Sequence, residues 1–130
     1  MAMKLTPLLT LCPLLVLAAP AEPKFRLQEI DKVSIGYGLA IADVDGDGKP
    51  DILLADQHTV QWYQNPTWKK HVIAENLTKL DHVCIAAQVV DGKCEVAVGA
   101  GWNPSDTVNS GAVFYLKAPA DPTQKWEAIA

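Results

Sequence analysis

The sequence predicts an all-β chain built from repeated four-stranded antiparallel units that follow a short leader. After residue 21, short apolar runs bounded by glycine and polar residues are frequent, and no stretch has the apolar spacing of an amphipathic helix. Much of this part of the chain also recurs after a shift of 44 residues. The first 21 residues, in contrast, have the composition of a targeting segment.

The leader is predicted to be a secretory signal peptide at residues 1–21. Lys4 precedes an apolar run from Leu5 to Leu17, and the sequence Ala-Pro-Ala at 19–21 offers a cleavage site. A membrane anchor is the weaker interpretation, because the run is too short to span a bilayer and contains two prolines. We therefore expect a secreted chain, extracellular or periplasmic, with no membrane span after cleavage.

The repeat covers both glycine-rich turns and the strands around them. A shift of 44 residues lays 47–55 onto 91–99, and it lays 39–42 onto 83–86. Segments opened by an aromatic residue also recur and are predicted to be strands, at Phe25–Ile30, Trp68–Ile73 and Trp126–Ile129. Runs rich in aromatic and β-branched residues at 60–63 and 112–116 supply one further strand to each unit.

Each repeat thus contains four short strands in about 40–50 residues, which is typical of a β-propeller blade. We expect a partial β-propeller of two to three four-stranded antiparallel blades in residues 22–130. It would comprise the last strand of one blade, a unit at about 37–73 and a unit at about 81–130. Because closed propellers have four to eight blades, we expect the remaining blades to be missing from this chain.

An acidic turn lies between the first two predicted strands of the first unit. Asp43, Asp45, Asp47 and Asp51 occupy positions 1, 3, 5 and 9 of this turn. Carboxylates so close together repel one another unless a hard cation such as Ca²⁺ neutralises them. The glycine after Asp47 lets the backbone turn so that Lys49 offers its carbonyl. The predicted calcium ligands are these four carboxylates and the Lys49 carbonyl.

This turn differs from an EF-hand loop. Its twelfth position is Leu54 in place of a bidentate Glu, and its flanks are apolar runs that are typical of strands. The turn is therefore predicted to cap a β-hairpin. A metal-free Asp/Gly turn remains the alternative, because Asp-Gly is also a common hairpin signal.

The second unit lacks most of these acidic residues. Ala87, Gln88 and Val89 stand where the first unit has Asp43, Val44 and Asp45. Only Asp91 and Glu95 repeat the acidic positions, so we expect no calcium site there.

The segment 34–52, which contains the acidic turn, resembles the FG-GAP (VCBS-type) repeat family. The segments 98–100 and 110–115 are similar to further parts of that repeat. The resemblance implies propeller blades that hold calcium in the first hairpin, as in integrin α-subunit heads and many secreted bacterial proteins. A narrower segment, 62–73, is similar to propellers of the aldos-2-ulose dehydratase type, a sugar lyase family, but its catalytic residues have no counterpart motif here.

A candidate ligand face follows from strand alternation, because successive turns of an antiparallel meander lie at opposite ends of the sheet. The turns after each second strand and the crossings between units then share the end opposite the calcium. Trp102 there either binds a ligand or packs within its loop. The residues expected at this end suit a polar ligand such as a sugar: Asp56, His58, Asp81, His82, Trp102 and Asn103.

Composition narrows the function further. The net charge of −4 and the absence of a basic patch argue against nucleic-acid binding. We expect a secreted calcium-binding module that binds an extracellular protein or carbohydrate, with Ca²⁺ as its cofactor and no catalytic residues. The alternative is part of a carbohydrate-active lyase. Cys84 and Cys94 either form a disulfide or are two small buried hydrophobic residues.

Overall fold

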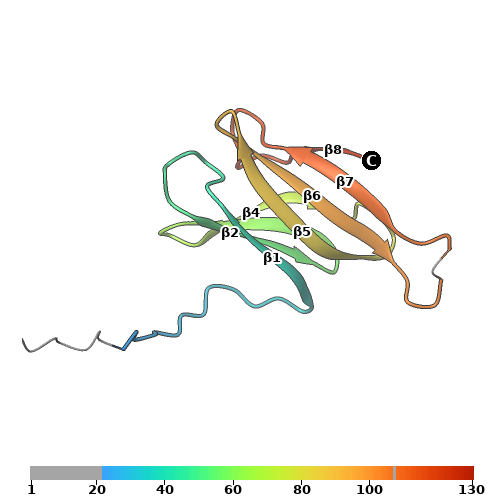
Figure 1. The fold of residues 1–130 in the computed structure, drawn as a ribbon, viewed down its shortest axis with the longest axis horizontal. Coiled ribbons are helices and arrows are strands. Elements are labelled where there is room, and N and C mark those ends of the chain that lie inside the picture. Colours follow the sequence, from blue (N-terminus) through green and yellow to red (C-terminus); the bar gives the residue numbers. More distant parts are fainter. Residues whose placement is uncertain (1–21, 107) are drawn as a thin grey trace, which may run out of the picture.

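The computed structural model describes residues 22–106 and 108–130. In this part of the chain there are strands and no helix (Figure 1). The predicted signal peptide lies outside the described residues. The strands are β1 (Gly36–Ala42), β2 (Asp51–Asp56), β3 (Thr59–Gln64), β4 (Lys69–Glu75), β5 (Asp81–Val90), β6 (Lys93–Trp102), β7 (Ala112–Lys117) and β8 (Glu127–Ile129).

The strands form two antiparallel sheets of four strands each, in the order β1-β2-β3-β4 and β5-β6-β7-β8. Each sheet is a meander in which every strand pairs with the next one in the chain (Figure 1). The prediction of an all-β chain made of four-stranded antiparallel units is confirmed. The arrangement is consistent with partial propeller blades.

The core lies between the two sheets. Alternate residues of a strand point to the same face, and those that face the other sheet form a single hydrophobic cluster. Leu53 and Trp62 of the first sheet and Val98 and Leu116 of the second are fully buried in it. Gly38 allows β1 to approach β5, because a Cβ at this position would lie only 3.0 Å from the backbone nitrogen of Ile85.

The two hairpins at the start of the sheets differ in length. The loop from Asp43 to Pro50 joins β1 to β2, whereas the two residues Asp91 and Gly92 join β5 to β6. Asp91 and Gly92 have positive φ angles of 49° and 72°, as in the tight turns that match the twist of paired strands. The second hairpin therefore has no loop in which several carboxylates could gather.

The shorter second hairpin shifts β5 relative to the sequence repeat. Leu54 pairs with Leu39, and its repeat Val98 pairs with Ile85. The repeat alone placed Val83 at the position of Leu39, so this part of the prediction is wrong by two residues. The shift keeps alternate side chains on the same face, because the side-chain period of a strand is two residues.

Two further expectations about strands are wrong. Phe25–Ile30 was expected to be the last strand of a preceding blade, but it forms no strand and pairs with none of the described strands. Trp102 was expected in a loop, but β6 extends through it and Trp102 pairs with Asp81 of β5. Its position is thus explained by the sheet.

The two described cysteines are free thiols. Cys84 pairs with Gly99 and is exposed, whereas Cys94 pairs with Val89 and is buried in the core. Burial raises the pKa of the Cys94 thiol to about 11. In this structure the disulfide interpretation is wrong, and only Cys94 acts as a small buried hydrophobic residue.

Candidate metal centre

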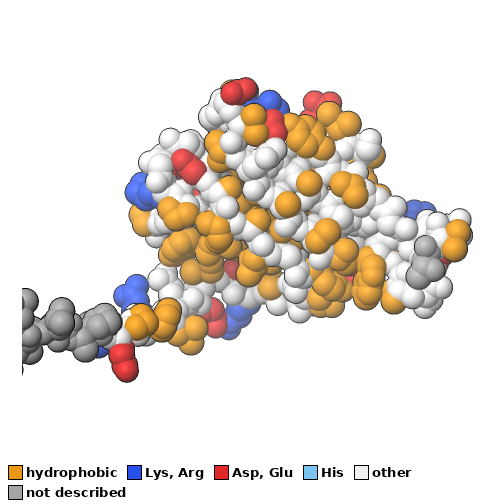
Figure 2. Space-filling view, viewed as in Figure 1, with side chains coloured by type: hydrophobic (Ala, Val, Ile, Leu, Met, Phe, Trp, Pro, Cys, Tyr) orange, Lys and Arg blue, Asp and Glu red, His pale blue; other side chains and the backbone are white. Residues whose placement is uncertain are grey.

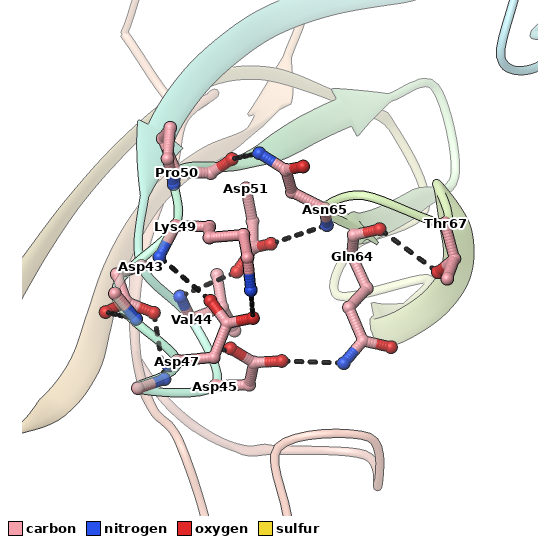
Figure 3. Close-up of polar contacts among 12 residues, drawn as sticks. Asp43, Val44, Asp45, Asp47, Lys49, Pro50, Asp51, Gln64, Asn65 and Thr67 are labelled. Carbon is pink, nitrogen blue, oxygen red and sulfur yellow. Dashed lines mark hydrogen bonds and ion pairs between the residues drawn. The ribbon is translucent and has the colours of Figure 1, made fainter.

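The acidic loop begins where β1 ends and returns at Asp51, which pairs with Ala42. Gly46 and Gly48 have φ angles of 77° and 83°, a backbone conformation that residues with a Cβ rarely adopt. Both glycines are exposed and have open space around them. They reverse the backbone so that the loop folds back over its own first carboxylate (Figure 3).

Asp43 organises the loop backbone. One oxygen of its carboxylate accepts a hydrogen bond from the Gly46 nitrogen at 2.9 Å, and the other accepts one from the Gly48 nitrogen at 2.9 Å. These bonds hold the loop in a curled form that leaves the carboxylate at its centre.

Asp51 anchors the other end of the loop and is fully buried. Its two oxygens accept hydrogen bonds from the backbone nitrogens of Val44, at 2.9 Å, and Asn65, at 2.8 Å. Burial raises the pKa of Asp51 despite these donors, and the nearby charges of Asp45 and Asp43 raise it further. The folded chain therefore carries an unfavourable buried charge here, which a cation would neutralise.

Asp45 is held from the end of β3. The Gln64 side-chain amide donates to Asp45 Oδ2 at 2.6 Å, and the backbone nitrogen of Asp47 donates to Asp45 Oδ1 at 3.2 Å. The side-chain amide of Asn65 also bonds the carbonyl of Pro50 at 2.9 Å (Figure 3). Sequence reasoning missed Gln64 and Asn65, although strand alternation places the β3–β4 turn at the same end of the sheet as the acidic loop.

Three of the four predicted carboxylates converge. Asp43, Asp45 and Asp51 each offer one oxygen, and these oxygens lie within 4.8 Å of one another. A carboxylate oxygen that accepts one hydrogen bond keeps a second lone pair for a cation. Several oxygen ligands around one point are the donor set that Ca²⁺ prefers, so the residues fit this ion.

Asp47 does not join this cluster. Its Oδ2 lies 2.5 Å from the Lys49 ammonium, and its Oδ1 accepts the backbone nitrogen of Lys49 at 2.8 Å. The hydrogen bond from the Lys49 side chain lowers the pKa of Asp47. Asp47 would have to leave Lys49 to bind an ion, and the predicted role of the Lys49 carbonyl stays a prediction.

The opposite end of the sheets contains part of the candidate ligand face. The ring of Tyr37, at the start of β1, meets Trp102 edge to face at a centroid distance of 6.5 Å. The Tyr37 hydroxyl donates to Asp81 at 2.6 Å, and the side chain of Gln57 donates to Asp81 at 3.2 Å. Asp45 follows the other end of β1, so this cluster and the acidic loop lie at opposite ends of that strand.

Three other residues of the predicted face, Asp56, Asn103 and His82, make contacts within the local fold, and His58 is exposed in the β2–β3 turn. The Asp56 carboxylate accepts hydrogen bonds from the backbone nitrogens of His58, at 2.9 Å, and Thr59, at 2.6 Å. These bonds shape the β2–β3 turn. Asn103 accepts the Ser105 nitrogen at 3.0 Å within its own loop. His82 is fully buried, and its Nε2 accepts a hydrogen bond from the Leu77 backbone nitrogen at 3.2 Å. Burial lowers the pKa of His82. His82 therefore lies inside the fold rather than on its surface.

Comparison with known proteins gives one family match, to the FG-GAP repeat over residues 35–60. The matched segment spans β1, the acidic loop, β2 and the start of β3. No curated protein and no solved structure matches the chain. Among the described residues, no helix has the length and apolar character to cross a membrane. The family match and the four-stranded sheet around it are consistent with an FG-GAP-type repeat at residues 35–60.

Proposed function

We propose that this chain is a secreted β-propeller-like module in which Ca²⁺ bound by the acidic loop fixes the first hairpin. FG-GAP repeats are typically extracellular, where calcium is abundant enough for sites of roughly 10⁻⁴–10⁻³ M affinity. The observation that carries the proposal is the convergence of the Asp43, Asp45 and Asp51 carboxylates, one of which is buried.

The ion would act as a structural element. It would offset the repulsion among three carboxylates and would hold β1, β2 and the β3–β4 turn together, because Gln64 and Asn65 contact the same loop. Calcium would supply charge neutralisation and oxygen coordination, and the sheets would supply the fixed positions of the ligands.

Calorimetric titration of calcium into the chelator-treated full chain tests the site. We expect one site per chain and an affinity that falls at least about tenfold in Asp45→Asn, which loses one charged ligand. Asp91→Asn is the matched control, because the tight β5–β6 turn accepts Asn and holds no carboxylate cluster. No calcium binding, or equal binding by the wild-type chain and Asp45→Asn, would contradict the proposal.

We propose in addition that the Tyr37, Asp81 and Trp102 cluster contacts the partner of this module. Trp102 is 49% exposed and lies beside a tyrosine and a carboxylate, a combination that stacks on and hydrogen-bonds a sugar ring. A protein partner is the alternative. This role is separate from the calcium site, which lies at the other end of β1.

An array of neutral oligosaccharides, probed with the full chain in calcium, tests this second proposal. We expect selective binding that Trp102→Ala reduces by up to about tenfold, since an aromatic contact contributes roughly 0.5–1.5 kcal/mol. Val108→Ala is the control, because Val108 is 85% exposed in the neighbouring loop. Binding that Trp102→Ala leaves unchanged would refute this role, and no binding to any sugar would favour a protein partner.

A further inference from the structure

Residues 77–80, which we call the crossing segment, lie in the connection between β4 and β5. Among the described residues, one hydrogen bond ties this segment to the rest of the fold: the Leu77 backbone nitrogen donates to Nε2 of His82 at 3.2 Å. The bonds of the Thr78 hydroxyl stay within the segment, because both join it to Leu80. The position of the crossing segment therefore depends on the acceptor that His82 provides, together with the packing of Leu77 against the core.

The bond from Leu77 determines which nitrogen of the His82 ring carries a proton. A neutral imidazole has one N–H donor and one acceptor nitrogen, so Nε2 accepts only if the proton is on Nδ1. The ring is fully buried, and its Nδ1 has no hydrogen-bond partner within the part of the chain that the structure describes. A second proton would have to bind Nε2, where it would face the Leu77 N–H as another donor. A protonated ring therefore cannot keep this bond.

Charged groups surround the buried ring on several elements. The titratable side chains near it are Asp56 and His58 of the β2–β3 turn, Asp81 of β5, and the exposed Glu75 and Lys79 before and within the crossing segment. Burial lowers the pKa of His82, and this effect outweighs the charge of Asp56 and the backbone groups of Asp56 and Thr59, which raise it. The ring is therefore neutral at neutral pH.

We propose that His82 is a pH-sensitive contact, which holds the crossing segment in place while its ring is neutral and releases the segment when Nε2 is protonated in mild acid. Release would expose the ring to water, where a histidine has its ordinary pKa of about 6.5. Because the pKa of the buried ring is lower than this value, the held form is fully stable above about pH 6.5 and loses stability as the pH falls below it. The contact contains no proposed calcium ligand.

The crossing segment leads directly into Asp81, whose carboxylate accepts hydrogen bonds from the Tyr37 hydroxyl and the Gln57 side chain. The surface near these residues is largely apolar, because Tyr37, Leu39 and Trp102 are all exposed, and Figure 2 shows hydrophobic side chains gathered around the place where Figure 1 draws β1. Release of the crossing segment would loosen the Tyr37, Asp81 and Trp102 cluster at this surface. That consequence rests on the partner role proposed above, whereas the pH-sensitive contact does not.

The experiment is amide hydrogen exchange of the ¹⁵N-labelled full chain, followed by NMR in calcium and without any sugar. The opening equilibrium of each amide is its exchange rate corrected for the intrinsic effect of pH. At Leu77 we expect this equilibrium to rise several-fold, up to about tenfold, from about pH 7.5 to about pH 5.5, because a released histidine is then mostly protonated. The amide of Val98, which is fully buried on the central strand β6, should not change.

His82→Gln is the test variant, because its side-chain oxygen can accept the Leu77 N–H and does not titrate. Its Leu77 amide should have the same opening equilibrium at both pH values. His58→Gln is the matched control, since His58 is exposed in the neighbouring turn and accepts no bond from Leu77, and this variant should keep the rise. If His82→Gln does not fold, the ring ¹⁵N shifts of the wild-type chain supply the test, and at about pH 7.5 they should show the His82 proton on Nδ1.

An opening equilibrium at Leu77 that is the same at both pH values would overturn the proposal. So would a rise in His82→Gln equal to that of the wild-type chain, loss of the rise in His58→Gln, or a His82 proton on Nε2 at about pH 7.5. A rise at Val98 as large as that at Leu77 would also overturn it, because the whole domain would then unfold in acid, as protonation of the buried His71 could cause. Since no sugar is present, each of these results is distinct from a failure of the proposed partner role.

Discussion

Replacing Trp62 by alanine is expected to lower the free energy of unfolding by about 3–5 kcal/mol, the usual cost of removing a buried large aromatic residue. Trp62 is fully buried between the two sheets, and its ring stacks on His71 at a centroid distance of 4.7 Å. Its indole nitrogen donates to the Pro122 carbonyl at 3.3 Å and so connects the first sheet to the segment before β8. Urea denaturation, followed by circular dichroism, measures the change.

Trp102→Ala is the matched control for this prediction. Trp102 is half exposed and lies at the end of β6, so its loss should cost far less than the loss of Trp62. Equal destabilisation by the two substitutions would mean that the core does not lie between the sheets.

Replacing Asp51 by alanine is expected to cost about 2–4 kcal/mol in the presence of calcium. The substitution leaves the Val44 and Asn65 backbone nitrogens without their acceptor, and a buried donor without a partner costs about 1–3 kcal/mol. It also removes one proposed calcium ligand. In chelator the loss should be smaller, because the substitution also relieves the repulsion of Asp51 by Asp43 and Asp45.

Asp47→Ala distinguishes this effect from a general loss of acidic charge. Asp47 is exposed and pairs with Lys49, so its removal should cost less than about 1 kcal/mol in chelator. Urea denaturation of both variants, with and without calcium, provides the comparison. If Asp51→Ala were as mild as Asp47→Ala in both conditions, the loop would not depend on its buried carboxylate.

The strands and the acidic loop could be predicted because their signals are local. Apolar runs such as 52–55, bounded by polar turn residues, indicate a buried strand, and the repeat of 44 residues indicates that the unit occurs twice. The convergence of Asp43 and Asp45 follows from alternate positions in one turn, whereas the positions of Asp45 and Asp51 are also fixed by hydrogen bonds from Gln64 and Asn65.

The errors arose where the outcome depends on partners far along the chain. Phe25–Ile30 has the composition of a strand but pairs with none of the described strands. Trp102 belongs to β6 because β5 begins at Asp81, and Asp81 pairs with Trp102. Gln64 and Asn65 contact the acidic loop only because the β3–β4 turn folds back to the same end of the sheet.

The register of the second hairpin also could not be predicted from the sequence repeat. A two-residue turn at Asp91-Gly92 lets β5 run on to Val90, where the first unit has already entered its acidic loop. The competition between a tight turn and an ion-binding loop therefore decides how far the strands extend, and the alignment of 39–42 with 83–86 does not contain that information.

Thermal unfolding of the full chain in calcium and in chelator is the most direct test of the proposed calcium site. Calcium at a hundredfold over its dissociation constant should stabilise the fold by about 2.7 kcal/mol, and the melting temperature should rise accordingly. Asp45→Asn should lose most of this rise, whereas Asp91→Asn should keep it. A melting temperature that is the same in calcium and in chelator would contradict the assignment of Asp43, Asp45 and Asp51 as a calcium site.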